Sequence, residues 1–591
     1  MRVVNRLAVA AVVLAGLLAG SARAQVMEQV PADAMVVVKL SNPQATSAKI
    51  SAFAKQVGME MEPFGDPLSF ALEQIGIKEG IRKDGQAAIV VFAPKGEAGE
   101  PPVMGLVPVT DYQAFLGNFK DPQKEGDVTV VSPEGIPTQL YIAKWGDFAA
   151  VSASKALLAK KPGGLKLAEQ SAKLLNNDKI DLSVYANAAP IRDMALPELK
   201  QQREQMVKQA VATYLENDGM EKYAPVIRTL VEQGLDLLQN TLQDAEAGVF
   251  AISMTDEGWN TTMLAEFAPS SKTGSMIKQI QNTDASLLRG LPQADYVVYG
   301  GMSQKSDVFS KFLSDVLAPV KAQLKQVGGE DAQAFVTAID AYTDYMKATT
   351  GGSFGAVLDP QAQQGMLKGT FVMEGDANAM MNAQEQMRKL GPVLGGIMPG
   401  PKQAMQYTEN AKTVEGVKLD KTTVEVKYDA GDPAQAMMKQ ITEFLYGKQG
   451  PVVYVGVVNP NRLVQILGGE EEFLQKAVAA AKAGEDPLAQ ANAVKAVNAQ
   501  LPQKRFAVGY VAVDKIITFA LSMENQAMGG GMQLQLPPNL PPVAFSMSSE
   551  GAALRADTHV PRQLVQALIS AFNKLQADME NRGGAGRPGD L

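Results

Sequence analysis

The pattern of hydrophobic and polar positions contains a phrase that recurs along the chain. In its first copy, the apolar and largely β-branched run Val36–Leu40 predicts a strand. Asn42 and Pro43 follow, and these residue types suit an N-cap and a first helical position. Apolar residues then recur at helical spacing until Gly58. The phrase therefore predicts a strand followed by a helix.

Three later segments have related patterns, Leu182–Asn187, Pro292–Tyr299 and Val452–Pro460. The first of these precedes two long stretches with apolar residues on one helical face, 199–215 and 225–242. The last repeats the Asn-Pro pair, so it predicts a helix that begins near residue 459.

Pairs of apolar runs separated by short turns predict hairpins elsewhere in the chain. They lie at 140–143 with 148–151, 249–254 with 260–267, 354–358 with 366–373, within 506–523, and within 543–556. A closing helix is predicted over 561–579. Hairpins followed by helices indicate an α+β fold, with antiparallel sheets and helices packed on one face.

The spacing of these landmarks predicts an internal duplication. The first and third helix starts lie about 261 residues apart, and the second and fourth lie about 271 residues apart. The turns at 253–258 and 546–551 are also alike. We therefore expect two related α+β halves in tandem, residues 25–288 and 289–580, and a disordered Gly-rich tail at 581–591.

The first 24 residues have the pattern of a bacterial signal peptide. Arg2 and Arg6 precede an apolar run, and Ala22-Arg23-Ala24 has the small-x-small form that signal peptidase recognises. The run is shorter than the roughly 20 residues that span a bilayer. We expect cleavage after Ala24, export to the periplasm or beyond, and no transmembrane span afterwards.

Charge and cysteine content narrow the function classes. The formal charge of −8 becomes −11 when Arg2, Arg6 and Arg23 are removed, which disfavours nucleic acid and anionic lipid as partners. The chain contains no cysteine, so thiol catalysis, thiolate zinc sites and disulfides are excluded. A chain of this length can bury sizeable cores without disulfides.

The opening Val30-Pro31-Ala32-Asp33 and its apolar strand, placed just after a signal peptide, carry a resemblance. This arrangement resembles bacterial exported proteins of unknown function that combine such an opening with later hairpin-then-helix units. The resemblance implies an extracytoplasmic location and an α+β fold. It implies no activity, because that family has none assigned.

Few residues form a catalytic pattern. The only histidine, His559, lies two residues after Asp557, and no Gly-x-Ser-x-Gly segment accompanies it. A multi-histidine metal site is therefore impossible. The set Ser152-x-x-Lys155, Tyr185-x-Asn187 and Lys272-Thr-Gly resembles the three boxes of serine β-lactamases and penicillin-binding proteins. Only about 30 residues separate the first two boxes, which argues against the match.

Two further clusters have a structural interpretation that we prefer. Methionines are numerous, and the group Met380, Met381, Met387 and Met398 is better suited to core packing than to copper binding. The run Glu470–Glu472 lies at a predicted helix start, where carboxylates complement the helix dipole. We therefore assign no catalytic, cofactor-binding or metal-binding residue.

Three hypotheses about function remain. The leading one is a non-catalytic, exported cell-envelope protein that binds or organises an unknown envelope partner. The second is a carrier of an apolar ligand such as a lipid, held between a curved sheet and the long helices at 199–215 and 225–242. The third is an acyl-serine hydrolase that uses Ser152 and Lys155.

Overall fold

The computed structural model describes residues 25–56, 58, 65–94, 100–133, 138–160, 162–215, 221–304, 307–359, 362, 365–397, 402–428, 431–468, 470–528 and 536–583. All statements below concern these residues. The predicted signal peptide, 1–24, and residues 584–591 of the predicted tail lie outside them. The fold is α+β, as predicted, and every pairing between its strands is antiparallel.

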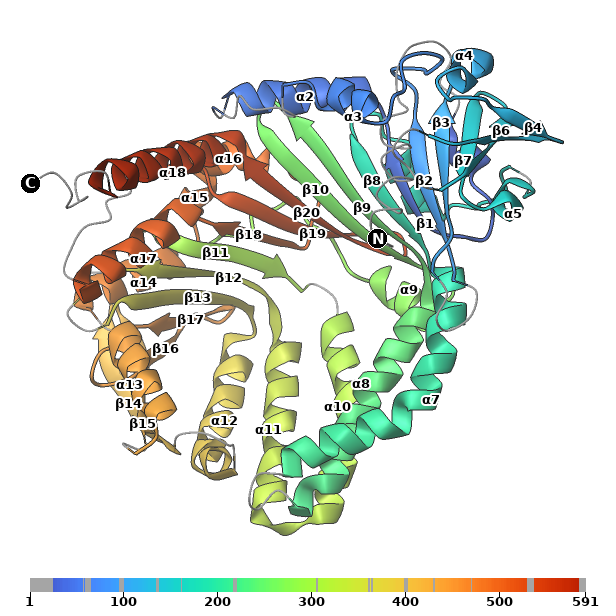
Figure 1. Ribbon diagram of the computed structural model, residues 1–591. Helices are drawn as coiled ribbons and strands as arrows, with labels where there is room; N and C mark the ends of the chain where they lie inside the picture. Colours follow the sequence, from blue (N-terminus) through green and yellow to red (C-terminus); the bar gives the residue numbers. More distant parts are fainter. Residues whose placement is uncertain are drawn as a thin grey trace, which may run out of the picture. The chain divides into compact units, whose positions relative to one another are not determined.

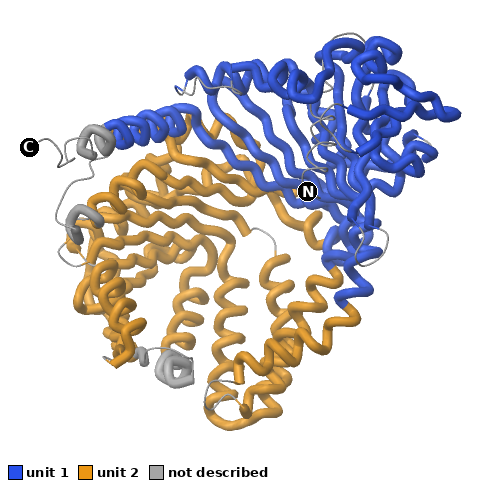
Figure 2. Tube along the Cα trace, viewed as in Figure 1, with its two compact units in different colours: residues 1–199, 241–275, 550–591 blue, residues 200–240, 276–549 orange. Residues whose placement is uncertain are grey.

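The chain divides into two compact units, each built from discontinuous segments (Figure 2). Unit 1 comprises residues 1–199, 241–275 and 550–591, and unit 2 comprises 200–240 and 276–549. These units differ from the two consecutive halves that the sequence predicts. The last strand, Ala553–Pro561, pairs with Gly258–Phe267 and so belongs to unit 1. The relatedness of the two predicted halves stays a prediction.

Unit 1 contains a sheet whose strands run in the order β4-β5-β6-β7-β3-β2-β1-β8-β9-β10-β20 (Figure 1). The strands are β1 (Ala34–Leu40), β2 (Ala87–Phe92), β3 (Val103–Pro108), β4 (Gln123–Glu125), β5 (Val128–Val131), β6 (Leu140–Trp145), β7 (Phe148–Ser152), β8 (Leu182–Asn187), β9 (Ala245–Thr255), β10 (Gly258–Phe267) and β20 (Ala553–Pro561).

The helices of unit 1 begin where the sequence places capping residues. In α2 the Asn42 side chain accepts a hydrogen bond from the Ala45 N–H at 2.9 Å, and in α3 the Asp66 side chain accepts one from Ser69 at 3.1 Å. The helices are η1 (Val26–Gln29), α2 (Pro43–Gln56), α3 (Pro67–Gln74), α4 (Tyr112–Leu116), α5 (Lys155–Leu158), α6 (Glu169–Leu175) and α18 (Arg562–Gly583). Three helices cross the unit boundary along the chain: α7 (Ala188–Leu215), α8 (Ala224–Asp244) and α9 (Lys272–Ile277).

The strands of unit 2 pair in the order β19-β18-β11-β12-β13-β17-β16-β15-β14. Its strands are β11 (Tyr296–Ser303), β12 (Thr349–Leu358), β13 (Leu367–Gly375), β14 (Lys402–Val414), β15 (Val417–Lys427), β16 (Val452–Asn459), β17 (Arg462–Leu467), β18 (Ala507–Val511) and β19 (Val543–Glu550).

The helices of unit 2 form two groups. One group extends away from the sheet, and there Tyr223 and Ile227 pack against Val320, Leu324 and Val336. The other group packs on the sheet. The helices are η2 (Glu221–Tyr223), α10 (Val308–Val327), α11 (Gly329–Ala348), α12 (Ala377–Ile397), α13 (Pro433–Tyr446), α14 (Glu471–Ala483), α15 (Pro487–Gln490), α16 (Asn492–Asn498) and α17 (Val513–Met528).

Two predicted elements are wrong. Asn459 and Pro460 do not start a helix, because they lie in the tight turn that joins β16 to β17. The segment 506–523 is not a hairpin, because β18 ends at Val511 and helix α17 follows. The loss of the helix start at 459 removes one of the landmarks behind the duplication. The β14–β15 hairpin was not predicted from the sequence.

Among the described helices, none combines the length and apolar character needed to cross a bilayer.

Candidate functional site

One face of the unit 2 sheet is buried under helices. On strands β13 and β17 the side chains of Val372, Val464 and Ile466 point to this covered face, where Leu474 and Val478 of α14 pack against them. All five are at most 1% exposed. These residues form the main core of unit 2. Successive side chains of a strand point to opposite faces of the sheet, so this core contains one of the two sets of side chains on each strand.

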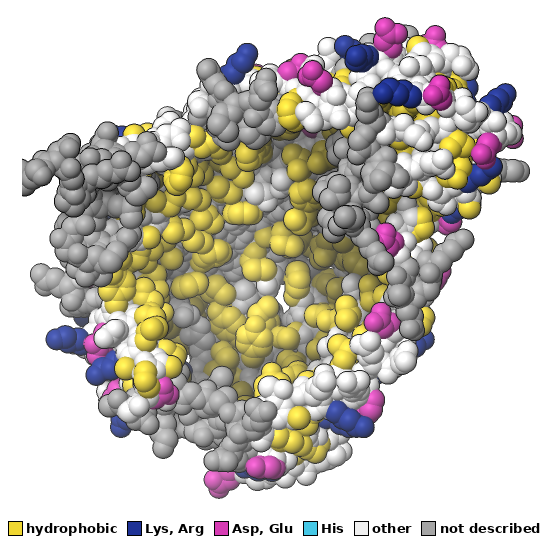
Figure 3. All heavy atoms as spheres, viewed as in Figure 1, with side chains coloured by type: hydrophobic (Ala, Val, Ile, Leu, Met, Phe, Trp, Pro, Cys, Tyr) yellow, Lys and Arg dark blue, Asp and Glu magenta, His cyan; other side chains and the backbone are white. Residues whose placement is uncertain are grey.

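The opposite face of β13 and of its neighbours β11, β12, β18 and β19 is apolar and has no helix over its central part. At its edge lies the polar side chain of Gln465, on β17, which is paired with Phe371. We call this apolar face the unit 2 open face. Cross-strand register places on it residues from β11, β12, β13, β18 and β19: Val298, Gly300, Met302, Gly352, Phe354, Ala356, Gly369, Phe371, Ala507, Gly509, Val511, Val543, Phe545 and Met547. None of these residues is charged or polar. Figure 3 shows hydrophobic side chains gathered over these strands, on a hollowed surface.

Aromatic and thioether side chains give the open face its exposed area. Phe354 and Phe371 are directly paired across β12 and β13, each is 38% exposed, and their stacked ring centroids lie 6.4 Å apart. Met302, Phe545 and Met547 are similarly exposed. Exposed apolar surface of this continuity is unusual in a monomer and marks a place of interaction.

The open face offers no hydrogen bonds to a ligand. Its side chains have no donors, and the backbone N–H and C=O groups are engaged in the ladders between strands. Four glycines expose only backbone atoms on this face: Gly300, Gly352, Gly369 and Gly509. An added Cβ at Gly509 would meet nothing within 4 Å, whereas at Gly300 it would overlap the Val508 carbonyl oxygen and at Gly352 it would lie 2.6 Å from that of Val372. The surface therefore has open space at Gly509, and its apolar side chains are complementary to hydrocarbon.

The open face ends where helix α12 covers the sheet. Met380 of α12 and Leu463 of β17 are fully buried there, together with Val455 of β16. Helices thus lie on both sides of the sheet at β16, at β17 and at the end of β13, where Met373 packs against the Met380 cluster of α12. On the same outward row Phe371 is 38% exposed, as is its partner Phe354. The one-sided packing predicted from the sequence holds for the central strands.

The sheet of unit 1 has a comparable face, which we call the unit 1 open face. The outward rows of β1, β2, β8, β9, β10 and β20 include Val36, Val38, Leu40, Ile89, Val91, Leu182, Val184, Ala186, Gly248, Phe250, Ile252, Thr261, Met263, Ala265, Leu554, Ala556 and Thr558. Met263 is 58% exposed. Two of these residues are threonines, and the same row of β9 begins with the exposed and charged Glu246.

The covered face of unit 1 holds the polar groups instead. Glu266 on β10 is buried and accepts hydrogen bonds from the backbone N–H groups of Gln170 and Ser171, at 2.9 and 2.8 Å. The Ser171 hydroxyl donates a third bond at 2.8 Å. These donors lie in the first turn of α6, so the carboxylate fixes that helix on the sheet.

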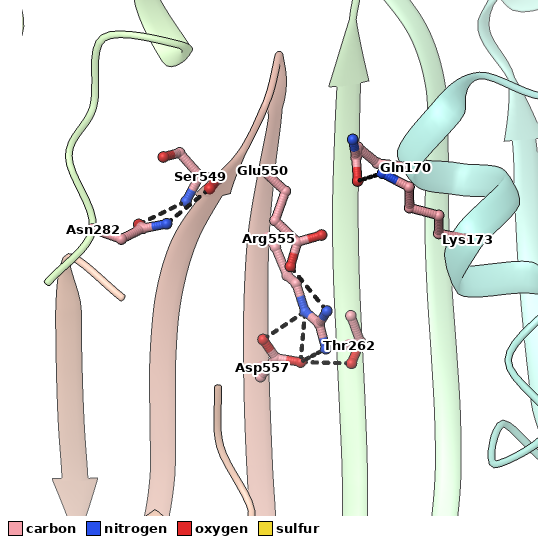
Figure 4. Close-up of polar contacts among 8 residues, drawn as sticks. All are labelled: Gln170, Lys173, Thr262, Asn282, Ser549, Glu550, Arg555 and Asp557. Atoms are coloured by element: carbon pink, nitrogen blue, oxygen red, sulfur yellow. Dashed lines mark hydrogen bonds and ion pairs between the residues drawn. The ribbon is translucent and has the colours of Figure 1, made fainter. Parts of the chain in front are cut away.

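A second buried network lies on the same face (Figure 4). Arg555 forms an ion pair with Asp557 at 2.9 Å and with Glu550 at 3.0 Å. The Thr262 hydroxyl donates to the Asp557 carboxylate at 2.7 Å. The same figure shows Asn282 bound to the backbone of Ser549 in unit 2. All of these groups have partners, so their role is structural.

His559 belongs to this covered face as well. It is 2% exposed, and its Nδ1 lies 2.7 Å from the Oδ1 of Asn260. Burial lowers the pKa of His559 to about 4, so the ring is neutral at physiological pH. The Asp557 carboxylate is bound to Arg555 rather than to His559, so the two do not form a catalytic pair.

The β-lactamase-like set is not brought together by contacts. The Ser152 hydroxyl is buried and donates to the Val103 carbonyl at 2.8 Å, whereas Lys155 pairs with Glu125 on the surface. Burial raises the pKa of Tyr185 to about 12, which keeps its hydroxyl protonated. Lys272 begins α9. Among the described residues, no hydrogen bond or ion pair joins any two of these four side chains.

The other candidate clusters lie in ordinary structural settings. Met380 is fully buried in a core, and Met398 lies outside the described residues. Glu470 is the N-cap position of α14 and binds Lys368 at 2.7 Å. Glu472 pairs with Lys476 at 2.7 Å within the same helix. In the described part of the chain, no group of three or more acidic or histidine side chains could hold a metal ion.

Sequence reasoning placed the ligand of the carrier hypothesis between a curved sheet and the long helices at 199–215 and 225–242, but it did not identify which strand rows form the open faces. A signal was present. The strands Val298–Met302 and Phe545–Met547 have small or apolar residues at every second position, and their intervening rows contain Ser303 and Ser546, which are buried. A strand with apolar residues on both faces favours burial on both sides. The structure supplies helices for only one.

Comparison with known proteins adds little. No family model matches the chain, and no curated protein matches it. Solved structures titled "Structure of crystal form IV of TP0453" and "Structure of crystal form I of TP0453" are similar over 48% and 49% of this chain and 97% and 99% of theirs. Sequence identity is 12% and 11%, and the TM-score is 0.20 for both. At that score the similarity carries no argument about fold or function.

Proposed function

We propose that the protein is a non-catalytic, exported protein of the cell envelope that acts by binding, and that its ligand is the hydrocarbon part of a lipid or similar amphiphile. The unit 2 open face is the observation that carries this proposal. Five neighbouring strands present only apolar side chains and glycine on a face without a helix over it.

The chemistry of the face favours hydrocarbon over a protein partner. Protein interfaces form about one hydrogen bond per 100–200 Å² and carry polar rims. Across its five strands the open face has no side chain that could donate or accept such a bond, and Gln465 of β17, paired with Phe371, is a polar side chain at its edge. An acyl chain needs none, and burying the exposed parts of Phe354, Phe371 and Met302 against it is favourable at about 25 cal/mol per Å².

Export is supported by the N-terminal pattern alone. The charged, apolar and small-x-small segments of residues 1–24 lead to a periplasmic or secreted protein, in a compartment bounded by membranes. In such a compartment, a carrier of hydrocarbon could take its lipid from one membrane and deliver it to another. The acyl-serine hydrolase hypothesis receives no support from the positions of Ser152 and Lys155.

Native mass spectrometry of protein purified from its membrane-containing extract without detergent tests the proposal. We expect bound lipid on the wild type and its loss from the double variant Phe354→Asp/Phe371→Asp. Phe572→Asp is the matched control, because Phe572 is 61% exposed but lies on helix α18 and not on a strand of the open face. Lipid-free wild type that also fails to take up added fatty acid would overturn the proposal.

A further inference from the structure

A cleft lies beside the C-terminal turn of α13, on the helix-covered side of the unit 2 sheet. Its sheet wall includes Lys421 of β15 and Tyr454 of β16, which are directly paired, and Tyr454 is paired in turn with Ile466 of the buried core. The cleft is therefore separate from the unit 2 open face. Its volume of about 620 Å³ lies within the range of about 300–1,000 Å³ that is usual for small-molecule sites.

The apolar wall of the cleft is held in place by the last turn of α13. The Met366 N–H donates a hydrogen bond to the carbonyl of Phe444. Gly365 lies so close to this turn that an added Cβ would overlap the backbone of Tyr446. The ring of Phe444 packs against Phe519 of α17, with centroids 6.1 Å apart. These contacts place the apolar side chains of Met366 and Phe444 along one side of the cleft.

The charged groups of the cleft are mostly cationic. Three lysines line it, Lys412, Lys421 and Lys448, and among the described residues that line it Glu443 is the only carboxylate. We call it the lysine cleft. Glu443 lies 3.8 Å from Lys439 and is thereby partly neutralised. Because the whole chain has a formal charge of −8, the lysine cleft reverses the sign of the charge locally.

Several hydrogen-bond donors of the lysine cleft are not used by the fold. Lys412 is paired with Glu471 of α14, and this hydrogen bond raises the pKa of Lys412. Lys421 and Lys448, in contrast, have no hydrogen bond or ion pair with any described residue. The residue Tyr454 is 6% exposed, and its hydroxyl also lacks a partner in the described part of the chain.

The positions of these donors suit one anionic group. Lys421 and Tyr454 lie directly opposite each other on neighbouring strands, so their Cβ atoms are about 5 Å apart on the same face. Lysine ammonium groups and hydroxyls both donate to phosphate and carboxylate oxygens, and such charge-assisted bonds are stronger than those between neutral groups. The apolar side chains beside them are complementary to a hydrocarbon body rather than to a free inorganic anion.

We propose that the lysine cleft binds an amphiphilic anion, a molecule with a phosphate or carboxylate head and an apolar body. The head accepts hydrogen bonds from Lys421 and Tyr454, and the body lies against Met366 and Phe444. This site goes beyond the proposed function and does not depend on it, because the unit 2 open face is the opposite face of the sheet. The negative charge of the whole chain opposes a surface of anionic lipid, whereas a single anion in the cleft is attracted by the nearest lysines, since salt screens charges farther than about 10 Å.

Isothermal titration calorimetry with octyl phosphate, and with octanol as the neutral probe, tests this site. We expect the wild type to bind octyl phosphate at least about tenfold more tightly than octanol, and Lys421→Gln/Lys448→Gln to lose this preference. The control Lys418→Gln/Lys504→Gln removes the same charge from two exposed lysines that do not line the cleft, so it should keep the preference. Added salt should weaken the binding of octyl phosphate to the wild type.

Two further measurements keep the test independent of folding defects. Unchanged thermal midpoints show that the variants are folded. Lys448→Gln alone, at an exposed position, should weaken octyl phosphate binding roughly threefold even if the double variant does not fold. Lys421→Arg/Lys448→Arg keeps both charges and should retain the preference.

The remaining outcomes separate the lysine cleft from the unit 2 open face. Phe354→Asp/Phe371→Asp should keep the preference for octyl phosphate, and its loss there would place the anion on the open face and overturn the proposal. Inorganic phosphate should bind at least about tenfold more weakly than octyl phosphate, because it leaves the apolar wall uncovered. Equal binding of the two would overturn the amphiphile. A wild type without any preference for the anion, or a glutamine variant that keeps it, would overturn the site.

Discussion

The two faces of each sheet differ in a way that reverses the usual expectation. In unit 1 the face covered by helices contains Glu266, Asp557 and His559, and the open face is almost purely apolar. In unit 2 the covered face includes the buried hydroxyls of Thr370 and Ser546, and the open face is apolar across β11, β12, β13, β18 and β19, with Gln465 of β17 at its edge. The comparison teaches that burial under helices and apolar character are separate properties here. Under the proposed function, the ligand that covers the open faces is itself apolar.

Adjacent residues of β13 give the largest expected contrast between the faces. Val372 is 1% exposed beneath α14, and its neighbour Phe371 is 38% exposed on the open face. Val372→Asp should unfold unit 2 or lower its stability by several kcal/mol, because a carboxylate would be buried without a partner. Phe371→Asp should lower it by less than about 1 kcal/mol. Thermal unfolding followed by circular dichroism measures both, and equal losses would contradict the assignment of faces.

Removal of a buried carboxylate should have the next largest effect. Asp557→Ala removes one of the two carboxylate partners of Arg555, which keeps Glu550, and leaves the Thr262 hydroxyl without its acceptor, at a cost of about 1–3 kcal/mol. The thermal midpoint should fall markedly. Glu100→Ala, which changes a carboxylate on the surface, serves as the control. A midpoint unchanged by Asp557→Ala would mean that this network is not buried in solution.

His559 predicts a specific pH dependence. Its pKa is about 4 in the folded protein and about 6.5 when unfolded, so only the unfolded state binds a proton between these values. Stability is therefore full above pH 6.5 and falls as the pH is lowered toward 4, by on the order of 3 kcal/mol. In His559→Gln this part of the decline should vanish, as measured by denaturant titrations between pH 4 and 7. An identical decline in both proteins would contradict the burial of the ring.

The smallest effect on stability is expected at the unit 1 open face. Met263 is 58% exposed, so Met263→Asp should change the free energy of unfolding by no more than about 0.5 kcal/mol. The thermal midpoint should therefore change little. Met263→Asp should also weaken the binding of a fluorescent fatty acid if the unit 1 open face contacts hydrocarbon. If Met263→Asp lowers the free energy of unfolding but leaves fatty-acid binding unchanged, the unit 1 open face is covered by protein in solution.

Much of the fold was predictable because its signals are local. Capping at Asn42 and Asp66, the Asp256-Glu257-Gly258 region between β9 and β10, and the apolar stripes of α8 and α10 all depend on nearby residues. The prediction of a helix start near residue 459, in the segment Val452–Pro460, was wrong for a physical reason. Asn-Pro suits a helix start and a tight turn equally well, and pairing of β16 with β17 decides between them at Pro460.

The candidate surface was less predictable than the fold. Apolar residues at Phe354 and Phe371 look the same in a sequence whether a helix covers them or not, because periodicity reports alternation and not the presence of a neighbouring layer. The division into units also depends on long-range pairing. β20 joins β10 across nearly 300 residues, as in the pair Asp557 and Thr262, and no local pattern encodes that choice.

Photo-crosslinking is the most direct test of the claim that hydrocarbon lies on the unit 2 open face. A fatty acid with a diazirine near the end of its chain would be irradiated with the intact protein, and the adducts located by peptide mass spectrometry. The account predicts adducts on outward residues of β11, β13 and β19, such as Met302, Phe371 and Met547. Adducts confined to other surfaces, with these strands unlabelled at saturating ligand, would contradict it.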